Sequence, residues 1–253
     1  MSEQKFKVTY NPIAPYRQVW GKNFPPVVLQ AAIGCAKKHS SYEVAKAGGI
    51  EAALILANDL INDEATKKIS ALIGNKKPLL IPVHAEEAIS INRIPLAYAM
   101  VIAAKFNLNV ELNIVQAAKV SRTGTDGFSR LAFPPPFSGK PSLDADYAII
   151  LDDTLTQGGT LANLKGYVAQ FGIKTLVATT LTGKNYSSVL TLSADTLTNL
   201  RGKYNELEYW WVEFFGYGFD CLTESEARYI LKSEKDADTI RNRIITERQK
   251  GFF

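Results

Sequence analysis

The stretch Tyr147-Ala-Ile-Ile-Leu-Asp-Asp-Thr-Leu-Thr-Gln-Gly-Gly-Thr160 decides the fold that we expect. It joins an apolar run, Tyr147 to Leu151, which is typical of a buried strand, to a polar turn rich in threonine and glycine. Apolar residues then recur three and four positions apart, which predicts a helix with one buried face: Leu161, Leu164, Val168 and Phe171. A strand, a tight turn and a helix in this order predict one unit of an α/β sheet.

The same alternation continues on both sides of this unit. We expect further strands at Pro78–Val83, Leu108–Val115 and Lys174–Leu181, and helices at Val27–Lys38, Tyr42–Asp59, Asp63–Gly74 and Asn92–Phe106. This pattern predicts an α/β fold with a central parallel sheet and helices on both faces, a Rossmann-like arrangement. The rest of the chain predicts mainly helical additions at both ends, so we divide it into residues 1–60 (a helical hood), 61–185 (the core) and 186–253 (an aromatic segment and a helical tail).

Two features of the last region have open interpretations. Thr223-Glu-Ser-Glu226 forms a capping box, which predicts a helix beginning there, and a charged helix is expected at Asp236–Gln249. The basic side chains of this charged helix indicate a solvated face more than a binding patch. The aromatic run Tyr209–Tyr217 indicates a core or an interface, although it has the chemistry to stack on a base.

Composition excludes several classes of protein. The chain has 253 residues, is 46% hydrophobic and 21% charged, and carries a net charge of +4. These values fit a globular protein, and the charge excess is too small to argue for nucleic-acid binding. Cys35 and Cys221 are too few for a disulfide scaffold, and the polar start Met1–Lys7 has no signal core. We therefore expect a cytoplasmic protein with no nucleic-acid or membrane partner.

The turn after the strand has the chemistry of a sugar-phosphate site. Glycine lets backbone amides approach an anion, and the start of the following helix favours phosphate. Two adjacent carboxylates, Asp152 and Asp153, suit a neighbouring group that donates hydrogen bonds, such as a ribose diol, or a hydrated Mg²⁺. The candidate phosphate loop consists of Thr154, Thr156, Gln157, Gly158, Gly159 and Thr160.

This segment resembles the motif that binds phosphoribosyl pyrophosphate (PRPP) in type I phosphoribosyltransferases. The match consists of four apolar residues (148–151), the acidic pair and the Thr/Gly loop (154–160), and the weaker likeness covers residues 75–185. The resemblance implies an enzyme that binds PRPP and Mg²⁺ and transfers the 5-phosphoribosyl group to a nitrogen acceptor, a nucleobase, with release of pyrophosphate. It implies that Asp152 and Asp153 are catalytic and contact the metal, directly or through water. The loop departs from the family pattern at Thr154 and Gln157.

Two further segments occupy places where this family contacts pyrophosphate. Ile81–Ala88 follows an early strand and supplies His84 and Ala85, although Glu86 and Glu87 in this segment would repel a pyrophosphate. The long polar stretch between Arg122 and Arg130 lies where the family has a flexible loop that closes over the substrate. Each of these side chains has an ordinary packed or solvated interpretation that stays open.

Other classes fit the same residues less well or remain alternatives. A haloacid dehalogenase pattern fails because Thr154 stands where a second Asp is needed, and no P-loop spacing or structural zinc spacing is present. A PRPP or nucleotide sensor without catalysis, and an interaction module, remain open. The sequence does not indicate which acceptor is used. A homodimer is the default expectation for the oligomeric state.

Overall fold

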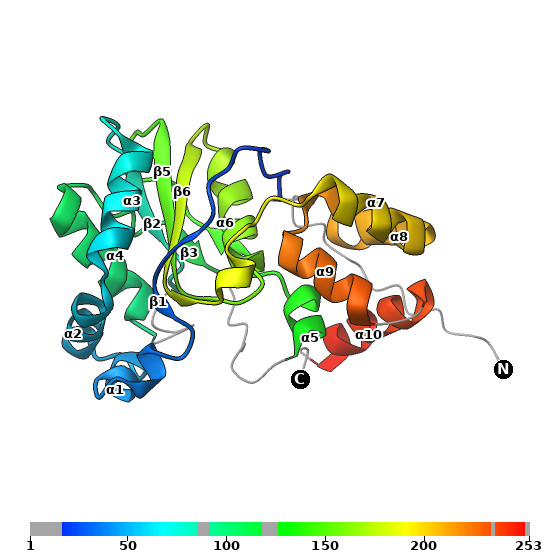
Figure 1. Cartoon of the computed structure of the whole chain (residues 1–253), viewed down its shortest axis with the longest axis horizontal. Coiled ribbons are helices and arrows are strands. Elements are labelled where there is room, and N and C mark those ends of the chain that lie inside the picture. The colour runs from blue at the N-terminus through cyan, green and yellow to red at the C-terminus, as the bar shows by residue number, and fades with distance from the viewer. Residues whose placement is uncertain (1–16, 86–91, 118–125, 234–235, 251–253) are drawn as a thin grey trace.

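A computed structural model of the chain describes residues 17–85, 92–117, 126–233 and 236–250. Its centre is a parallel sheet with strand order β1-β6-β5-β2 (Figure 1). The four strands are β1 (Val28–Ala32), β2 (Leu79–Pro82), β5 (Tyr147–Leu155) and β6 (Lys174–Gly183). The predicted α/β fold with a central parallel sheet is therefore confirmed.

The central strands are apolar because both faces of the sheet are covered. Ala148, Ile149, Ile150 and Leu151 of β5 are all fully buried. Side chains alternate across a strand, so Ile149 and Leu151 pack into one core layer and Ile150 packs into the other. A near-continuous apolar run of this kind is what a doubly covered parallel strand requires.

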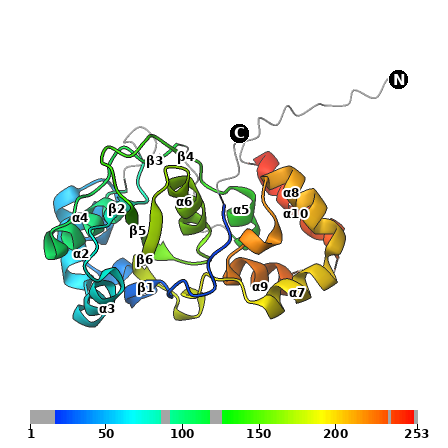
Figure 2. The same ribbon diagram turned by 90° about the horizontal axis from the view of Figure 1, so that it is seen from above.

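Helices cover both faces, as the sequence predicts (Figure 2). One core layer lies beneath α2, α3 and α4, and the other lies beneath α6. Gly74 ends α3 with a positive φ of 55°, and Pro95 lies in the first turn of α4. The bounds of these helices are α1 (Tyr42–Lys46), α2 (Ile50–Leu60), α3 (Asp63–Ile73), α4 (Ile94–Phe106) and α6 (Gly159–Ala169).

A third core layer joins the helices that follow the sheet. It packs around the fully buried Trp211 and includes Phe128 of α5, which lies far away in the sequence. The aromatic run lies in and just after α8, where Trp211, Phe215 and Tyr217 are buried, so the core interpretation is confirmed for these three. The elements are α5 (Gly127–Ala132), α7 (Ala194–Lys203), α8 (Asn205–Phe215), α9 (Glu224–Ser233) and α10 (Ala237–Lys250).

Short elements complete the described chain. A two-stranded antiparallel ribbon pairs Val115 with Ser138. The ribbon consists of β3 (Val115–Gln116) and β4 (Phe137–Ser138), and the short 3-10 helices are η1 (Ala36–Lys38), η2 (Asn185–Ser187) and η3 (Phe219–Cys221). No helix within the described ranges is long and apolar enough to span a bilayer.

Two predicted elements are wrong, and a third is divided in two. The expected helix at Val27–Lys38 is the edge strand β1 followed by η1, so the region of residues 1–60 contributes a strand to the core sheet. Its apolar run suits a strand and a helix equally, and pairing with β6 decides between them. The expected strand at Leu108–Val115 is reduced to a single bridge between Val110 and Leu80, with β3 starting at Val115. The expected helix at Tyr42–Asp59 is interrupted at Gly48 and Gly49 and forms α1 and α2.

Removal of one methyl group from the sheet core tests how tightly that core is packed. We expect Ile150→Val to lower the free energy of unfolding by about 0.5–1.5 kcal/mol, because the lost methyl leaves a cavity beside α6. Ile55→Val on α2 is the matched control, since Ile55 is 52% exposed, and it should change stability by less than about 0.5 kcal/mol. Urea unfolding measures both, and equal effects would mean that Ile150 is loosely packed.

Candidate functional site

The acidic pair lies inside β5 and not after it. The sequence predicts that the strand ends at Leu151, but β5 continues through Asp152 and Asp153 to Leu155. The reason is its pairing with β6, in which Asp152 lies opposite Thr180 and Leu155 lies opposite Gly183. Thr154 also joins this pairing, with its Oγ1 3.2 Å from Oγ1 of Thr182. The polar turn therefore begins at Thr156, and the hydroxyl of Thr154 contacts the neighbouring strand.

Both glycines of the turn are needed for its geometry. Gly158 has a φ of +83°, and a Cβ there would lie 2.4 Å from Cδ2 of Leu190. Gly159 is the first residue of α6, and a Cβ there would lie 2.3 Å from Oε1 of Glu226. The turn therefore brings bare backbone to the start of a helix, whose first amide groups lack partners within the helix.

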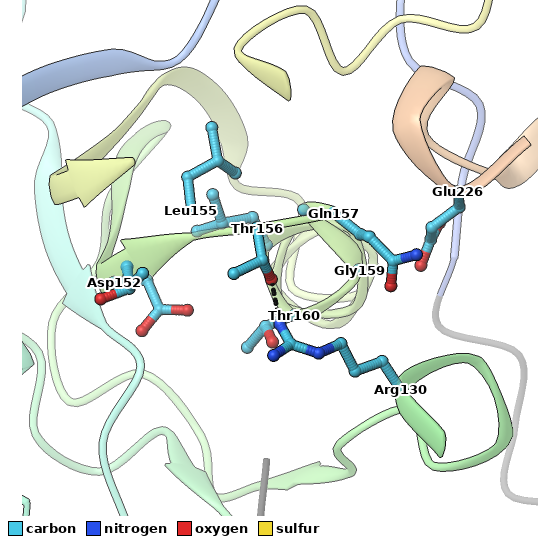
Figure 3. Close-up of a pocket in the computed structure, with 11 residues that line it drawn as sticks. Arg130, Asp152, Leu155, Thr156, Gln157, Gly159, Thr160 and Glu226 are labelled. Carbon is cyan, nitrogen blue, oxygen red and sulfur yellow. Dashed lines mark hydrogen bonds between the residues drawn. The ribbon is translucent and has the colours of Figure 1, made fainter. Parts of the chain in front are cut away.

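The turn lines a small, shallow hollow (Figure 3). Asp152, Thr156, Thr160 and Arg130 point toward the same space in this view. Nη1 of Arg130 donates a hydrogen bond to Oγ1 of Thr156 at 2.5 Å, and burial lowers the pKa of Arg130 below its ordinary value. The hollow thus has the carboxylate of Asp152 at one side and the guanidinium of Arg130 at the other. The carboxylate of Glu226, which is paired with Arg17, also lines it beside the helix start.

The two carboxylates have different surroundings. Asp153 accepts a hydrogen bond from Nδ2 of Asn92 at 2.8 Å and forms an ion pair with Nζ of Lys46 at 3.3 Å. Burial alone would lower the pKa of Lys46, but Asp153, with smaller contributions from Tyr42 and Asp152, outweighs burial, and the pKa lies above its ordinary value. Asp152 lines the hollow, and its Oδ1 accepts the backbone N–H of Asp153 at 2.8 Å. Asp152 is therefore the member of the pair that faces a ligand in the hollow.

A buried ion pair supports the turn from behind. Arg17 donates to both carboxylate oxygens of Glu226, at 2.6 and 2.9 Å, and its Nε donates to Oδ1 of Asn163 in α6 at 2.6 Å. Arg17 is 6% exposed and Glu226 is 2% exposed. The predicted capping box is confirmed as well, because the Thr223 N–H donates to Oε2 of Glu226 and the Glu226 N–H donates to Oγ1 of Thr223. The same Thr223 hydroxyl donates to the carbonyl of Gln157 in the turn at 2.6 Å.

The predicted pyrophosphate turn lies at the same edge of the sheet. β2 pairs with β5, and the Val83 N–H donates to the Leu151 carbonyl at 2.7 Å, so His84 and Ala85 follow next to the acidic pair. They line a separate hollow with Arg93 and Asn113. Burial, and then the charge of Arg93, lower the pKa of His84. Its Nε2 has no hydrogen-bond partner among the described residues.

The predicted flexible loop is only partly described. Arg122 lies outside the described residues, as do Glu86 and Glu87. Residues 127–130 belong to α5, whose Phe128 is fully buried and whose N-cap, Asp126, accepts the Ser129 N–H at 2.8 Å. The expectation of a mobile loop is therefore wrong for this part. Arg130 of α5 nevertheless reaches the turn, where its Nη1 donates to Oγ1 of Thr156.

Four important residues were missed by sequence reasoning: Arg17, Lys46, Asn92 and Glu226. Arg17 stands in an irregular aromatic segment, and Lys46 and Asn92 have no motif around them. The capping box identified Glu226 as a helix cap but gave no sign of its contact with Arg17. The predicted Gln157 lines the hollow, although its Oε1 is buried without a partner in the described chain.

The described residues contain no group of three or more His, Cys, Asp or Glu side chains arranged to hold a metal ion. The acidic pair is therefore no protein-only cage. It fits the way Mg²⁺ is bound in phosphate chemistry, with one or two carboxylates while water and substrate oxygens complete the shell.

The fold and this site define an α/β protein with a parallel sheet and a strand–turn–helix hollow. No protein-family model matches the chain. An uncharacterized protein of Haemophilus influenzae is 53% identical over 152 residues, which cover 60% of this chain and 34% of that protein. Protein TraN of Escherichia coli is 40% identical over 236 residues, which cover 93% of this chain and 52% of that protein. The chain thus spans about a third and about half of the lengths of these curated relatives.

The buried pair behind the turn makes a testable prediction. We expect Glu226→Gln to lower the free energy of unfolding by about 3–5 kcal/mol, because it leaves the buried charge of Arg17 without its counter-ion. Glu213→Gln is the matched control on an exposed face of α8, and it should change stability by less than about 0.5 kcal/mol. Urea unfolding compares them, and similar losses would mean that the pair does not stabilise the fold.

Proposed function

We propose that the chain is a type I phosphoribosyltransferase, which binds PRPP with Mg²⁺ and transfers its 5-phosphoribosyl group to a nitrogen acceptor. The observation that carries the proposal is the turn between β5 and α6. The turn joins β5 directly to the start of α6, and Asp152 of β5 lines the same hollow as the first residues of that helix. The motif resemblance supports the same assignment.

The 5-phosphate would lie at the start of α6. The first amides of a helix, which have no partners within the helix, and the helix dipole favour an anion there. Thr156 and Thr160 supply hydroxyl donors to the hollow, and Arg130 adds a positive charge beside Thr156. Phosphate held in this way is remote from the bond that breaks, so its binding energy serves to position the reacting carbon.

The ribose would lie toward the carboxylates. Asp152 can accept hydrogen bonds from the vicinal hydroxyls of the sugar, and the neighbouring Asp153 is held in place by Lys46 and Asn92. Positive charge develops on the ribose ring as the anomeric bond breaks. A fixed carboxylate beside that ring stabilises this charge more in the transition state than in the ground state.

In the proposed reaction, the bond between the anomeric carbon and a pyrophosphate oxygen breaks, and its electron pair leaves with the pyrophosphate. The lone pair of the acceptor nitrogen forms the new C–N bond, and the nitrogen releases a proton to solvent. Bound Mg²⁺, held by the substrate and Asp152, would neutralise charge on the departing pyrophosphate. His84 and Ala85, at the neighbouring strand end, are candidates to contact that group. A nucleobase acceptor and a homodimer are parts of the same proposal.

Removal of the ribose-binding charge tests the proposal. We expect Asp152→Asn to weaken PRPP binding in the presence of Mg²⁺ by about a hundredfold, because two charge-assisted hydrogen bonds are weakened. The double variant Asp152→Asn with Asp153→Asn should abolish binding. Titration calorimetry measures the affinity.

The matched control is Asp144→Asn with Asp146→Asn, which removes two exposed carboxylates just before β5. Its PRPP affinity should equal that of the unmodified chain. Unchanged affinity in the Asp152→Asn variant, or no PRPP binding by the unmodified chain, would contradict the proposal. Failure to bind any phosphorylated ribose would favour an interaction module.

A sensor that binds PRPP without transferring it is the second candidate. The observation in its favour is the engagement of Asp153 by Lys46 and Asn92, which reduces the negative charge available to a cationic ribose. Pyrophosphate release in the presence of PRPP, Mg²⁺ and a panel of nucleobases separates the two. We expect release with at least one base, and binding without release would identify the sensor.

A further inference from the structure

A second, larger hollow lies beside the phosphate loop, between the sheet and the C-terminal helices. It shares Arg130, Thr156 and Gln157 with the first hollow and extends past η2 to α9. Together with its open mouth it encloses about 1350 Å³. We call it the basic hollow, after the cations that line it: Arg130, Lys184, Arg228 and Lys232.

The charged side chains that line the basic hollow are all cationic. No carboxylate is among its described lining residues. Arg228 is partly neutralised, because its Nε lies 3.8 Å from Oε1 of Glu224 and its Nη2 donates to the Tyr186 carbonyl at 2.8 Å. Lys184 and Lys232 have no carboxylate partner within 4.0 Å in the described part of the chain. Like charges held around one concave wall repel each other, so an anion placed among them would be stabilised.

Two buried hydroxyls lie in the same wall. Ser187 is 1% exposed and Ser225 is 8% exposed, and both line the hollow. Neither Oγ has a hydrogen-bond partner among the described residues. Buried polar groups are almost always paired, and leaving one unpaired is costly. Both oxygens are closed to solvent in this structure, so a ligand with acceptor oxygens would supply their partners after the side chains rotate toward the hollow.

We propose that the basic hollow is a second ligand site, which takes a small molecule with two or more phosphate groups. Lysine and arginine are the side chains that bind phosphate oxygens, and seryl hydroxyls donate to them as well. Several cations spread along one wall match several anionic groups better than a single one. A small molecule is favoured over a nucleic acid because these cations line a hollow and the whole chain carries a net charge of only +4.

The proposed second site and the proposed PRPP site can be altered separately by mutation, although they share three lining residues. Asp152 lines the first hollow and does not line the basic hollow. Lys184 and Lys232 line the basic hollow and not the first. The two groups of residues therefore allow each site to be altered alone, and the second proposal does not depend on the first.

Titration calorimetry with inorganic tripolyphosphate tests the site, with the full chain and low salt. We expect tripolyphosphate to bind the unmodified chain, and Lys184→Gln with Lys232→Gln to weaken that binding by at least about tenfold, since each lysine makes a charge-assisted contact. Ser187→Ala should weaken it further. Asp152→Asn should leave tripolyphosphate binding unchanged, and circular dichroism melting checks that every variant is folded.

The matched control is Lys67→Gln with Lys105→Gln, which removes the same net charge from exposed positions on α3 and α4. It should bind tripolyphosphate as the unmodified chain does. The proposal is overturned by an absence of tripolyphosphate binding, by an equal loss in the control pair, or by unchanged affinity in Lys184→Gln with Lys232→Gln, which would put the ligand at the turn. Failure of the chain to bind PRPP would overturn the proposed transferase and leave this test intact.

Discussion

The buried pair of Arg17 and Glu226 is the contact on which the site depends. It joins three parts of the chain, because Arg17 precedes the sheet, Glu226 belongs to α9, and Asn163 and the Gly159 carbonyl of α6 accept further guanidinium hydrogen bonds. A buried ion pair is stable only when hydrogen bonds satisfy its donors and acceptors, because both charges have lost their hydration. Glu226 also accepts the Thr223 N–H, and the Arg17 guanidinium lies 4.9 Å from the centre of the Tyr217 ring.

This contact explains why the turn has its particular shape. Glu226 occupies the space that a side chain at Gly159 would need, so the ion pair of Glu226 and Arg17 covers the start of α6 on that flank. Elsewhere around the hollow, Asp152 of β5 supplies a negative charge and Arg130 of α5 supplies a positive charge. A ligand that is anionic at one end and becomes cationic at the other matches such a division. A phosphorylated sugar in a substitution reaction has this character.

Local patterns were enough to predict the strand, the turn and the helix after Tyr147, because apolar spacing and glycine act within a few residues. The same reasoning misassigned Val27–Lys38, where the outcome depends on pairing with β6 and not on the run itself. It also ended β5 too early, since polar residues in a strand look like a loop unless the neighbouring strand is known. Arg17 and Lys46 could not be found, because their partners lie 209 and 107 positions away.

During synthesis, the edge strand β1 is made long before β6, the strand with which it pairs. Oγ1 of Thr179 donates to the Val28 carbonyl, and these residues are 151 positions apart. At a translation rate of about 5–20 residues per second, β1 leaves the ribosome roughly eight to thirty seconds before β6 exists to cover it. During that interval its apolar side chains and unpaired amides are open to other nascent chains. A chaperone that shields such segments would therefore influence the yield of this protein more than its final stability.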